Sequence, residues 1–307
     1  MSAPAAALPA GMHVFERGWL SSNNILFCAE GKNVLVDTGY LTHAPQTLSL
    51  LQHVLQGAPL HQIVNTHLHS DHCGGNALLQ QHYGCHTSIP HLEAEKVRRW
   101  DQEQLSYLAT GQSCQRFDFH ATIAPGDCFV WGQREWQALA APGHDPHSLM
   151  FYCAEEQILI SADALWQRGF GVIFPELEGE SGFAETRATL ELIASLKIRL
   201  VIPGHGAPFS DSAAALDYAF ARIDFLQSEP VRNAQNALKV LLKFLLLERQ
   251  QIALAELPAL MAEIPLFKKV NLRFLQQESQ ALAEWAVQQL LHSRVARIDG
   301  AYLCNAD

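Results

Sequence analysis

The sequence lacks a CxxC pair, a surplus of positive charge and a long uncharged apolar run. It holds seven cysteines in 307 residues, an odd number that favours free thiols in a reducing compartment over a disulfide framework. The formal net charge of −10 argues against a general polyanion binder, since nucleic-acid binding needs a basic surface. The most apolar run, residues 237–250, is too short to span a bilayer and contains Lys239 and Lys243.

Targeting signals and several common catalytic motifs are also missing. The first fifteen residues have neither the basic n-region nor the strongly apolar core of a signal peptide. We therefore expect a cytoplasmic protein that does not associate with membranes. The chain contains no Walker loop, GxSxG, HExxH or dinucleotide-binding motif, which excludes the chemistry that each would support.

Strand and helix signals alternate over the first two hundred residues. Apolar runs at 24–30 and 33–39 predict a hairpin, because Gly31-Lys32 separates them. Helical spacing at 44–55 precedes a short buried strand at 61–66, and residues 94–108 are expected to be helical. A second series of the same kind follows, with strands at 128–132, 135–143 and 199–206, a hairpin at 148–163 that turns at Glu155-Glu156, and a helix at 183–196. The similar order predicts two related halves packed face to face.

The pattern changes after residue 211, where helices predominate. We expect helices at 213–227, 231–250, 254–262 and 277–292, followed by a hairpin that turns at Asp299-Gly300. The chain is thus predicted to divide into a catalytic domain, residues 1–211, and a helical, winged-helix-like domain, residues 212–307. Nine basic and eight acidic residues from 229 onward make a weak nucleic-acid footprint, so a packing or dimerisation module is the alternative for this region.

One segment, "NTHLHSDHCGGN" at residues 65–76, concentrates three histidines and an aspartate within six positions. Residues two apart on extended backbone point the same way, so His67 and His69 can converge on one point. Asp71 and His72 follow after the chain turns and can reach a second point nearby. The two glycines allow a sharp turn and close backbone approach. Imidazole and carboxylate together suit zinc and iron-like ions.

This loop cannot complete two metal sites alone, since each ion takes about four to six ligands. Three further candidates each follow a predicted strand: His144 in "APGHDPHS", Asp163 in "ILISAD" and His205 in "VIPGHG". Sites in α/β proteins form at that edge of a sheet.

Five motifs in this order, "VDTG", "THLHSDH", "PGHDPHS", "SAD" and "PGHG", resemble those of the metallo-β-lactamase superfamily over residues 13–210. The resemblance implies an α/β fold, a four-layer αββα sandwich with the site in the cleft between its halves. A mainly helical C-terminal domain would follow the sandwich.

The resemblance also implies a ligand set. His67, His69 and His144 would hold one metal, Asp71, His72 and His205 a second, and Asp163 would bridge them. Asp37 would orient ligands through hydrogen bonds. Two divalent ions, zinc first, with iron or manganese as alternatives, would activate a hydroxide at neutral pH. Asp71 would help to hold or deprotonate that nucleophile.

The function predicted on this basis is hydrolysis of an ester, thioester, lactone or phosphoester in a small molecule. A metal-dependent ribonuclease, a mononuclear-iron persulfide dioxygenase and a metal-sensing regulator are the alternatives. His69 replaces the glutamate of flavodiiron relatives, and no ligand is the cysteine of antibiotic-hydrolysing enzymes. Substrate contacts are predicted for Trp19, Trp166, Phe170 and His147, the last where many relatives have glycine. Substrate identity and a homodimeric state are left open.

Overall fold

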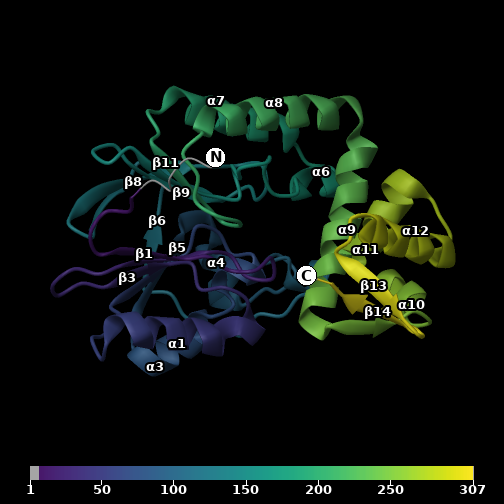
Figure 1. Cartoon of the computed structure of the whole chain (residues 1–307), viewed down its shortest axis with the longest axis horizontal. Coiled ribbons are helices and arrows are strands. Elements are labelled where there is room, and N and C mark those ends of the chain that lie inside the picture. The colour runs from purple at the N-terminus through teal and green to yellow at the C-terminus, as the bar shows by residue number, and fades with distance from the viewer. Residues whose placement is uncertain (1–6, 307) are drawn as a thin grey trace.

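The computed structural model describes residues 7–306 and contains two mixed β-sheets packed face to face (Figure 1). The first sheet has the order β1-β2-β3-β4-β5-β6 and the second the order β11-β10-β9-β8-β7. The strands of the first sheet are β1 (Met12–Phe15), β2 (Asn24–Phe27), β3 (Val34–Val36), β4 (Gln62–Val64), β5 (His86–Pro90) and β6 (Ala121–Ile123). Those of the second are β7 (Cys128–Trp131), β8 (Arg134–Ala140), β9 (Leu149–Cys153), β10 (Ile158–Ala162) and β11 (Leu200–Pro203).

Helices cover the outer face of each sheet, which completes four layers. In Figure 1, α1 and α3 lie outside the first sheet, and α7 and α8 lie outside the second. The helical segments of this part are η1 (Leu41–His43), α1 (Ala44–Leu55), α2 (Ser70–Cys73), α3 (Asn76–Tyr83), η2 (His91–Glu93), α4 (Ala94–Arg99), α5 (Tyr107–Thr110), α6 (Phe174–Glu178), α7 (Phe183–Ser195) and α8 (Ser212–Ser228). The predicted αββα sandwich is confirmed.

Strand direction explains why polar loops gather at one edge. In the first sheet β3, β4, β5 and β6 run parallel, and in the second β10 and β11 are parallel. Between the sheets lies an apolar core that includes Val36, Val64, Phe151, Ile160 and Ile202, each at most 1% exposed. The strands are rigidly packed there, so the residues that follow their carboxyl ends are held in fixed positions.

One helix prediction was wrong. Residues 94–108 do not form a single helix, because α4 ends at Arg99 and Trp100 adopts a left-handed conformation with φ 53°. The Trp100 ring packs against Tyr107 and Phe117, with ring centroids 5.9 and 5.4 Å away. Burying this aromatic cluster reverses the chain before α5 begins.

The C-terminal region is mainly helical and carries a small antiparallel sheet of order β12-β14-β13. Its elements are α9 (Pro230–Arg249), β12 (Gln251–Ala253), α10 (Leu257–Glu263), α11 (Pro265–Val270), the π-helix η3 (Asn271–Leu275), α12 (Ser279–His292), β13 (Ala296–Asp299) and β14 (Tyr302–Asn305). The hairpin at Asp299-Gly300 forms as expected, whereas β12, α11 and η3 were not predicted.

The helices of the C-terminal half pack into two different hydrophobic cores. Ala215, Ala219 and Ile223 of α8 pack into the core of the sandwich, whereas α9 onward forms a separate core that also takes in Val172 and Leu177. The division at 211/212 stays a prediction, since α8 shares its packing with the sandwich. No helix within residues 7–306 is long and apolar enough to cross a membrane.

Candidate metal centre

The histidine-rich loop lies between β4 and α2, as its sequence predicts. His69 keeps extended backbone (φ −63°, ψ 147°) immediately before α2, so that His67 and His69 present their rings to the same side. The two glycines are needed because other parts of the chain approach their backbone closely. They are not needed for unusual backbone angles, since Gly74 has the helical conformation φ −61°, ψ −24°. A Cβ on Gly74 would lie 2.9 Å from the carbonyl carbon of Tyr40, and one on Gly75 would lie 3.0 Å from Cβ of Thr38.

The rings of His67, His69 and His144 converge on one point. Nδ1 of His69 lies 3.1 Å from Nε2 of His67 and 2.8 Å from Nε2 of His144. Nitrogen ligands about 2.0–2.1 Å from a tetrahedral zinc ion would lie roughly 3.3 Å apart, so the spacing is close to that of a zinc site.

A second group lies beside the first and consists of Asp71, His72 and His205. Oδ2 of Asp71 lies 3.0 Å from Nε2 of His205 and 3.8 Å from Nε2 of His72. Asp163 lies between the two groups. Its Oδ2 is 3.3 Å from Nε2 of His144 and 3.9 Å from Nε2 of His205, and its Oδ1 is 3.5 Å from Nε2 of His72. One carboxylate therefore reaches ligands of both groups, as a bridging ligand must.

Hydrogen bonds at the back of two rings fix which nitrogen faces the cluster. Nδ1 of His144 donates to the carbonyl oxygen of Val172 at 2.6 Å, and Nδ1 of His72 donates to Oδ2 of Asp37 at 2.8 Å. Nε2 of each ring then faces the cluster, as a ligand nitrogen must. Nε2 of His72, which faces the cluster, is buried and has no hydrogen-bond partner within the described chain. Buried polar atoms are rarely left unsatisfied, so the donor set fits a bound cation.

The environment keeps most of these rings neutral, which is the form that binds a metal. Burial lowers the pKa of His69 to about 4 and that of His144 to about 4, and it lowers the pKa of His67 well below the ordinary value. His72 is the exception. Burial alone would lower the pKa of His72, but the carboxylates of Asp163 and Asp37 raise it well above its ordinary value.

Both carboxylates of the cluster are held in the anionic form. Burial alone would raise the pKa of Asp163, but the nearby His72 and His205 rings hold it well below its usual range. Burial alone would also raise the pKa of Asp71. The His72 ring and the hydrogen bond from His205 have the larger effect, so the pKa of Asp71 is lowered. Five imidazoles and two carboxylates thus form a donor set whose charge suits divalent ions.

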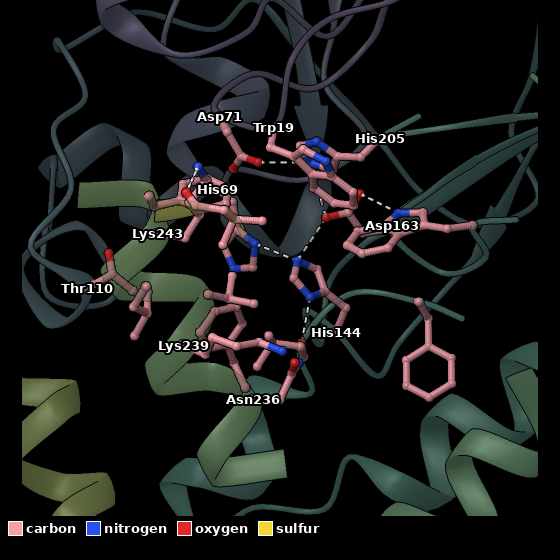
Figure 2. A pocket seen from close by; sticks show the side chains of 18 of the residues that line it. Trp19, His69, Asp71, Thr110, His144, Asp163, His205, Asn236, Lys239 and Lys243 are labelled. Atoms are coloured by element: carbon pink, nitrogen blue, oxygen red, sulfur yellow. Dashed lines mark hydrogen bonds and ion pairs between the residues drawn. The ribbon is translucent and has the colours of Figure 1, made fainter. Parts of the chain in front are cut away.

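A cavity of ≈ 400 Å³ opens directly onto this cluster. His69, Asp71, His144, Asp163 and His205 form part of its lining, and Figure 2 shows their side chains converging at one end. Sequence reasoning missed the opposite wall, which belongs to α8, α9 and the C-terminal region. Arg222, Asn236 and Lys239 line the cavity there, and only the docking of these helices on the sandwich reveals their position. A volume of this size suits a small molecule.

The predicted substrate contacts fall in two places. Trp19, Trp166 and Phe170 line the cavity, and the Trp19 ring stacks on the His205 ring at 5.4 Å with an interplanar angle of 7°. Nε1 of Trp166 donates to Oδ1 of Asp163 at 3.2 Å. His147 is not among the lining residues. Its Nδ1 contacts a carboxylate oxygen of Glu93, so the structure directs this ring to a neighbouring acid.

Asp145 is a further residue that the sequence motifs did not single out. Its Oδ2 lies 3.8 Å from Nε2 of His69, the nitrogen that faces away from the cluster. Burial, together with the charge of Glu93, raises the pKa of Asp145. Asp145 follows His144 directly, and nothing in the sequence indicated that it would face a second ligand.

A sandwich of two mixed sheets with a histidine and aspartate cluster at its edge defines a class of metal-binding proteins. The family model described as the metallo-beta-lactamase superfamily matches residues 17–205, which is more than half of the chain. The chain therefore belongs to the metallo-beta-lactamase superfamily, as the motifs predicted.

Curated relatives are similar over the ligand-bearing part. The chain is 26% identical over 141 residues to the hydroxyacylglutathione hydrolase of Rhizobium etli, covering 45% of this chain and 48% of that protein. It is 30% identical over 115 residues to the protein of the same name from Bartonella henselae, covering 38% of each. The matches thus span about half or less of the length of these relatives.

One solved structure is similar along nearly the whole chain. A metallo-beta-lactamase family protein from Thermus thermophilus has a TM-score of 0.59 and 19% identity, covering 98% of this chain and 100% of that one. The likeness is one of fold, and it extends over the C-terminal region.

Proposed function

We propose that this protein is a metal-dependent hydrolase that cleaves an ester-type bond in a small molecule. The observation that carries the proposal is the arrangement of two ligand groups around Asp163 at one end of a ≈ 400 Å³ cavity. His67, His69 and His144 would hold one ion, Asp71, His72 and His205 would hold the other, and Asp163 would bridge them. When bound, two ions would supply Lewis acidity and lower the pKa of a shared water towards ~7.

The side chains of the site support this chemistry in distinct ways. Asp71 lines the cavity as an anion beside His205, with its Oδ2 3.0 Å from Nε2 of that ring. A carboxylate whose pKa is lowered is a weak proton acceptor, so Asp71 suits holding and orienting a nucleophile better than deprotonating it. Trp19 and Trp166 pack against the ring of His205, which is 4% exposed.

Zinc is the metal proposed first, because imidazole and carboxylate ligands at these spacings suit it. Iron and manganese accept the same donors. Among ester-type bonds, a thioester is the first to test. The curated relatives are named hydroxyacylglutathione hydrolases, and the compound in that name is an acylated thiol.

Metal content and a substrate panel test the proposal together. Protein purified without added metal is analysed for zinc, iron and manganese, then assayed on thioesters, lactones, phosphodiesters and RNA, with oxygen uptake followed in parallel. We expect up to two metal ions per chain and turnover of an ester-type compound. His144→Ala and Asp163→Ala should lose metal and turnover together, whereas His53→Ala, at an exposed position on α1, should lose neither. One iron per chain with oxygen consumption would overturn the hydrolase assignment.

Ribonuclease activity is the second candidate. The C-terminal region supports it, since its helices followed by the β13-β14 hairpin match the order expected of a winged helix. The net charge of −10 and the size of the cavity favour a small molecule instead. Cleavage of RNA in the panel with no turnover of small esters would reverse this ranking.

A further inference from the structure

The cavity has an uneven distribution of charge. Its acidic lining residues, Asp71 and Asp163, both belong to the ligand cluster. Every other charged residue that lines it is basic, namely Arg168, Arg222, Lys239 and Lys243. This stands in contrast to the chain as a whole, which carries a formal net charge of −10. A cationic wall inside an acidic protein calls for a specific explanation.

Two of the four cations have other reasons for their position. Nζ of Lys243 donates to the carbonyl oxygens of Val295 at 2.7 Å and Ala306 at 3.1 Å, so it ties the two ends of the β13-β14 hairpin to α9. Arg168 is exposed at the edge of the cavity. Neither arrangement points to a ligand.

Arg222 and Lys239 differ, because no carboxylate within residues 7–306 pairs with either of them and neither makes a hydrogen bond there. Burial lowers the pKa of both groups, and the charge of Arg222 lowers that of Lys239 further. Two like charges that are partly removed from water and lack a counter-ion destabilise a fold. An anion bound between them would offset that cost.

The loop after β10 packs closely against the guanidinium group of Arg222. The Cζ atom of Arg222 lies 5.3 Å from the centroid of the Phe170 ring, which is 2% exposed. Gly169 has φ +96°, and a Cβ there would lie 2.9 Å from Cδ and 3.0 Å from Nη1 of Arg222. The same loop carries Trp166, whose indole contacts Asp163, so one segment positions both the guanidinium and a bridging carboxylate.

On the other side, α9 presents Lys239 together with Asn236 one turn before it. In Figure 2, Asn236 and Lys239 lie on one side of His144, and Asp71 and His205 lie on the other. Apolar residues make up much of the remaining lining. Phe174 is one of them, and its ring centroid lies 5.2 Å from that of His69 and 5.4 Å from that of His144.

We propose that Arg222 and Lys239, with Asn236 as a neutral donor, form an anion-binding subsite in the cavity of the metal centre. The substrate would be a small ester-type compound with a carboxylate or phosphate group at the end remote from the bond that is cleaved. A short apolar segment between the two would lie against Phe174. This assignment of substrate class rests on the proposed hydrolase function.

Matched substrates test the subsite in the metal-loaded full-length protein. Three thioesters of equal chain length would end in a carboxylate, a phosphate or a neutral methylamide. We expect wild type to prefer one or both charged compounds. Arg222→Gln and Lys239→Gln should each lower kcat/KM for the preferred compound about tenfold and leave the methylamide unchanged. Lys239→Arg should retain the preference. Arg249→Gln and Lys268→Gln, which remove exposed cations, are the charge-matched controls.

Anion binding gives a readout that needs no turnover. Calorimetric titration with glutarate and with inorganic phosphate should show weaker binding in Arg222→Gln and Lys239→Gln than in wild type at equal metal content. Variant-dependent binding without turnover of any ester would refute the hydrolase function and leave the subsite standing. Ester turnover with no preference for charge, or equal losses on charged and neutral substrates, would refute the subsite. Binding of RNA but of neither small anion would overturn the small-molecule assignment.

Discussion

Asp37 holds His72 from behind, with Oδ2 of the carboxylate 2.8 Å from Nδ1 of the ring. The same carboxylate accepts two hydrogen bonds from Thr66, one from the backbone N–H at 2.9 Å and one from the hydroxyl at 2.8 Å. Asp37 itself has left-handed backbone with φ 58° directly after β3. The aspartate therefore fixes the direction of a candidate metal ligand and ties β3 to the loop that follows β4.

Substitution of Asp37 should weaken metal binding without touching a metal ligand. Asn tolerates left-handed backbone, so Asp37→Asn keeps the geometry and removes the charge that stabilises the hydrogen bond to His72. We expect a loss of about 10–100-fold in metal affinity, measured by competition with a chromophoric chelator. Asp127→Asn, at an exposed turn, is the control. Unchanged affinity in Asp37→Asn would mean that the ring is oriented by packing alone.

Gly204 is a second position where a small change should disable the site. A Cβ there would overlap Oδ1 of Asp163 and lie 3.0 Å from Cε1 of His72, and neither side chain can withdraw from its buried position. We expect Gly204→Ala to lower metal content and turnover together, as measured by elemental analysis and kinetics. Gly18→Ala, where nothing lies within 4 Å of the added carbon, should have neither effect. Full metal loading in Gly204→Ala would contradict the assignment of Asp163 as a bridge.

The indole of Trp166 should contribute to metal affinity through its hydrogen bond to Asp163. Trp166→Phe keeps an aromatic ring beside His205 but leaves Oδ1 of Asp163 without this donor. We expect a loss in affinity of about tenfold, the lower end of effects seen when ligand-orienting partners are removed. Trp19→Phe is the matched comparison, because Trp19 stacks on His205 without a hydrogen bond to the cluster among the described residues. Equal effects of the two variants would assign the contribution to the ring rather than to its N–H group.

Acid should destabilise the metal-free protein at a higher pH than is usual. Burial lowers the pKa of His69 to about 4 and that of His144 to about 4, against 6.5 in the unfolded chain. Between these values the unfolded chain binds protons that the folded chain does not, so the free energy of unfolding falls as pH falls. The expected loss from pH 6.5 to pH 4.5 is about 2 kcal/mol for each ring. Urea titrations across this range measure it.

His72 determines how the stability of the metal-free protein changes above pH 6.5. Its pKa is raised by Asp163 and Asp37 despite burial, so its contribution is complete below pH 6.5 and declines as pH rises towards the folded value. Stability of the metal-free protein should therefore be greatest near pH 6.5 to 7. In His69→Gln the acid loss should shrink, and an unchanged acid slope in that variant would refute the assignment of this titration.

The sequence was sufficient to predict the αββα sandwich and to identify the residues that form the cluster. Candidate ligands stand directly after strands, and a strand end fixes a side chain relative to its neighbours in a way that spacing reveals. His67 and His69 lie two apart on extended backbone, and His205 follows a buried apolar strand. At such positions the local sequence pattern is enough to predict where the side chain lies in the folded protein.

Residues whose position depends on packing between distant segments could not be predicted. Lys239 belongs to an amphipathic helix, and its pattern would fit a solvent-facing lysine equally well. His147 is predicted to contact the substrate, and the structure places its Nδ1 against the carboxylate of Glu93, 54 residues away in sequence. Trp100 ends a predicted helix partly because its ring packs against Phe117, which lies beyond that helix. Each outcome depends on contacts that no local window contains.

Helix α9 packs in the C-terminal core and also forms part of the cavity wall. One side of this helix is buried in the C-terminal core, and the other contributes Asn236 and Lys239 to the cavity whose far end holds the histidines. The candidate metal ligands thus all precede residue 206, while much of the opposite wall of the cavity follows residue 229. We expect that exchanging the C-terminal region for that of another family member would change which molecules the cavity admits. The candidate metal ligands would stay the same. On the proposed function, selectivity in this architecture could therefore diverge by recombination, without a change in any metal ligand.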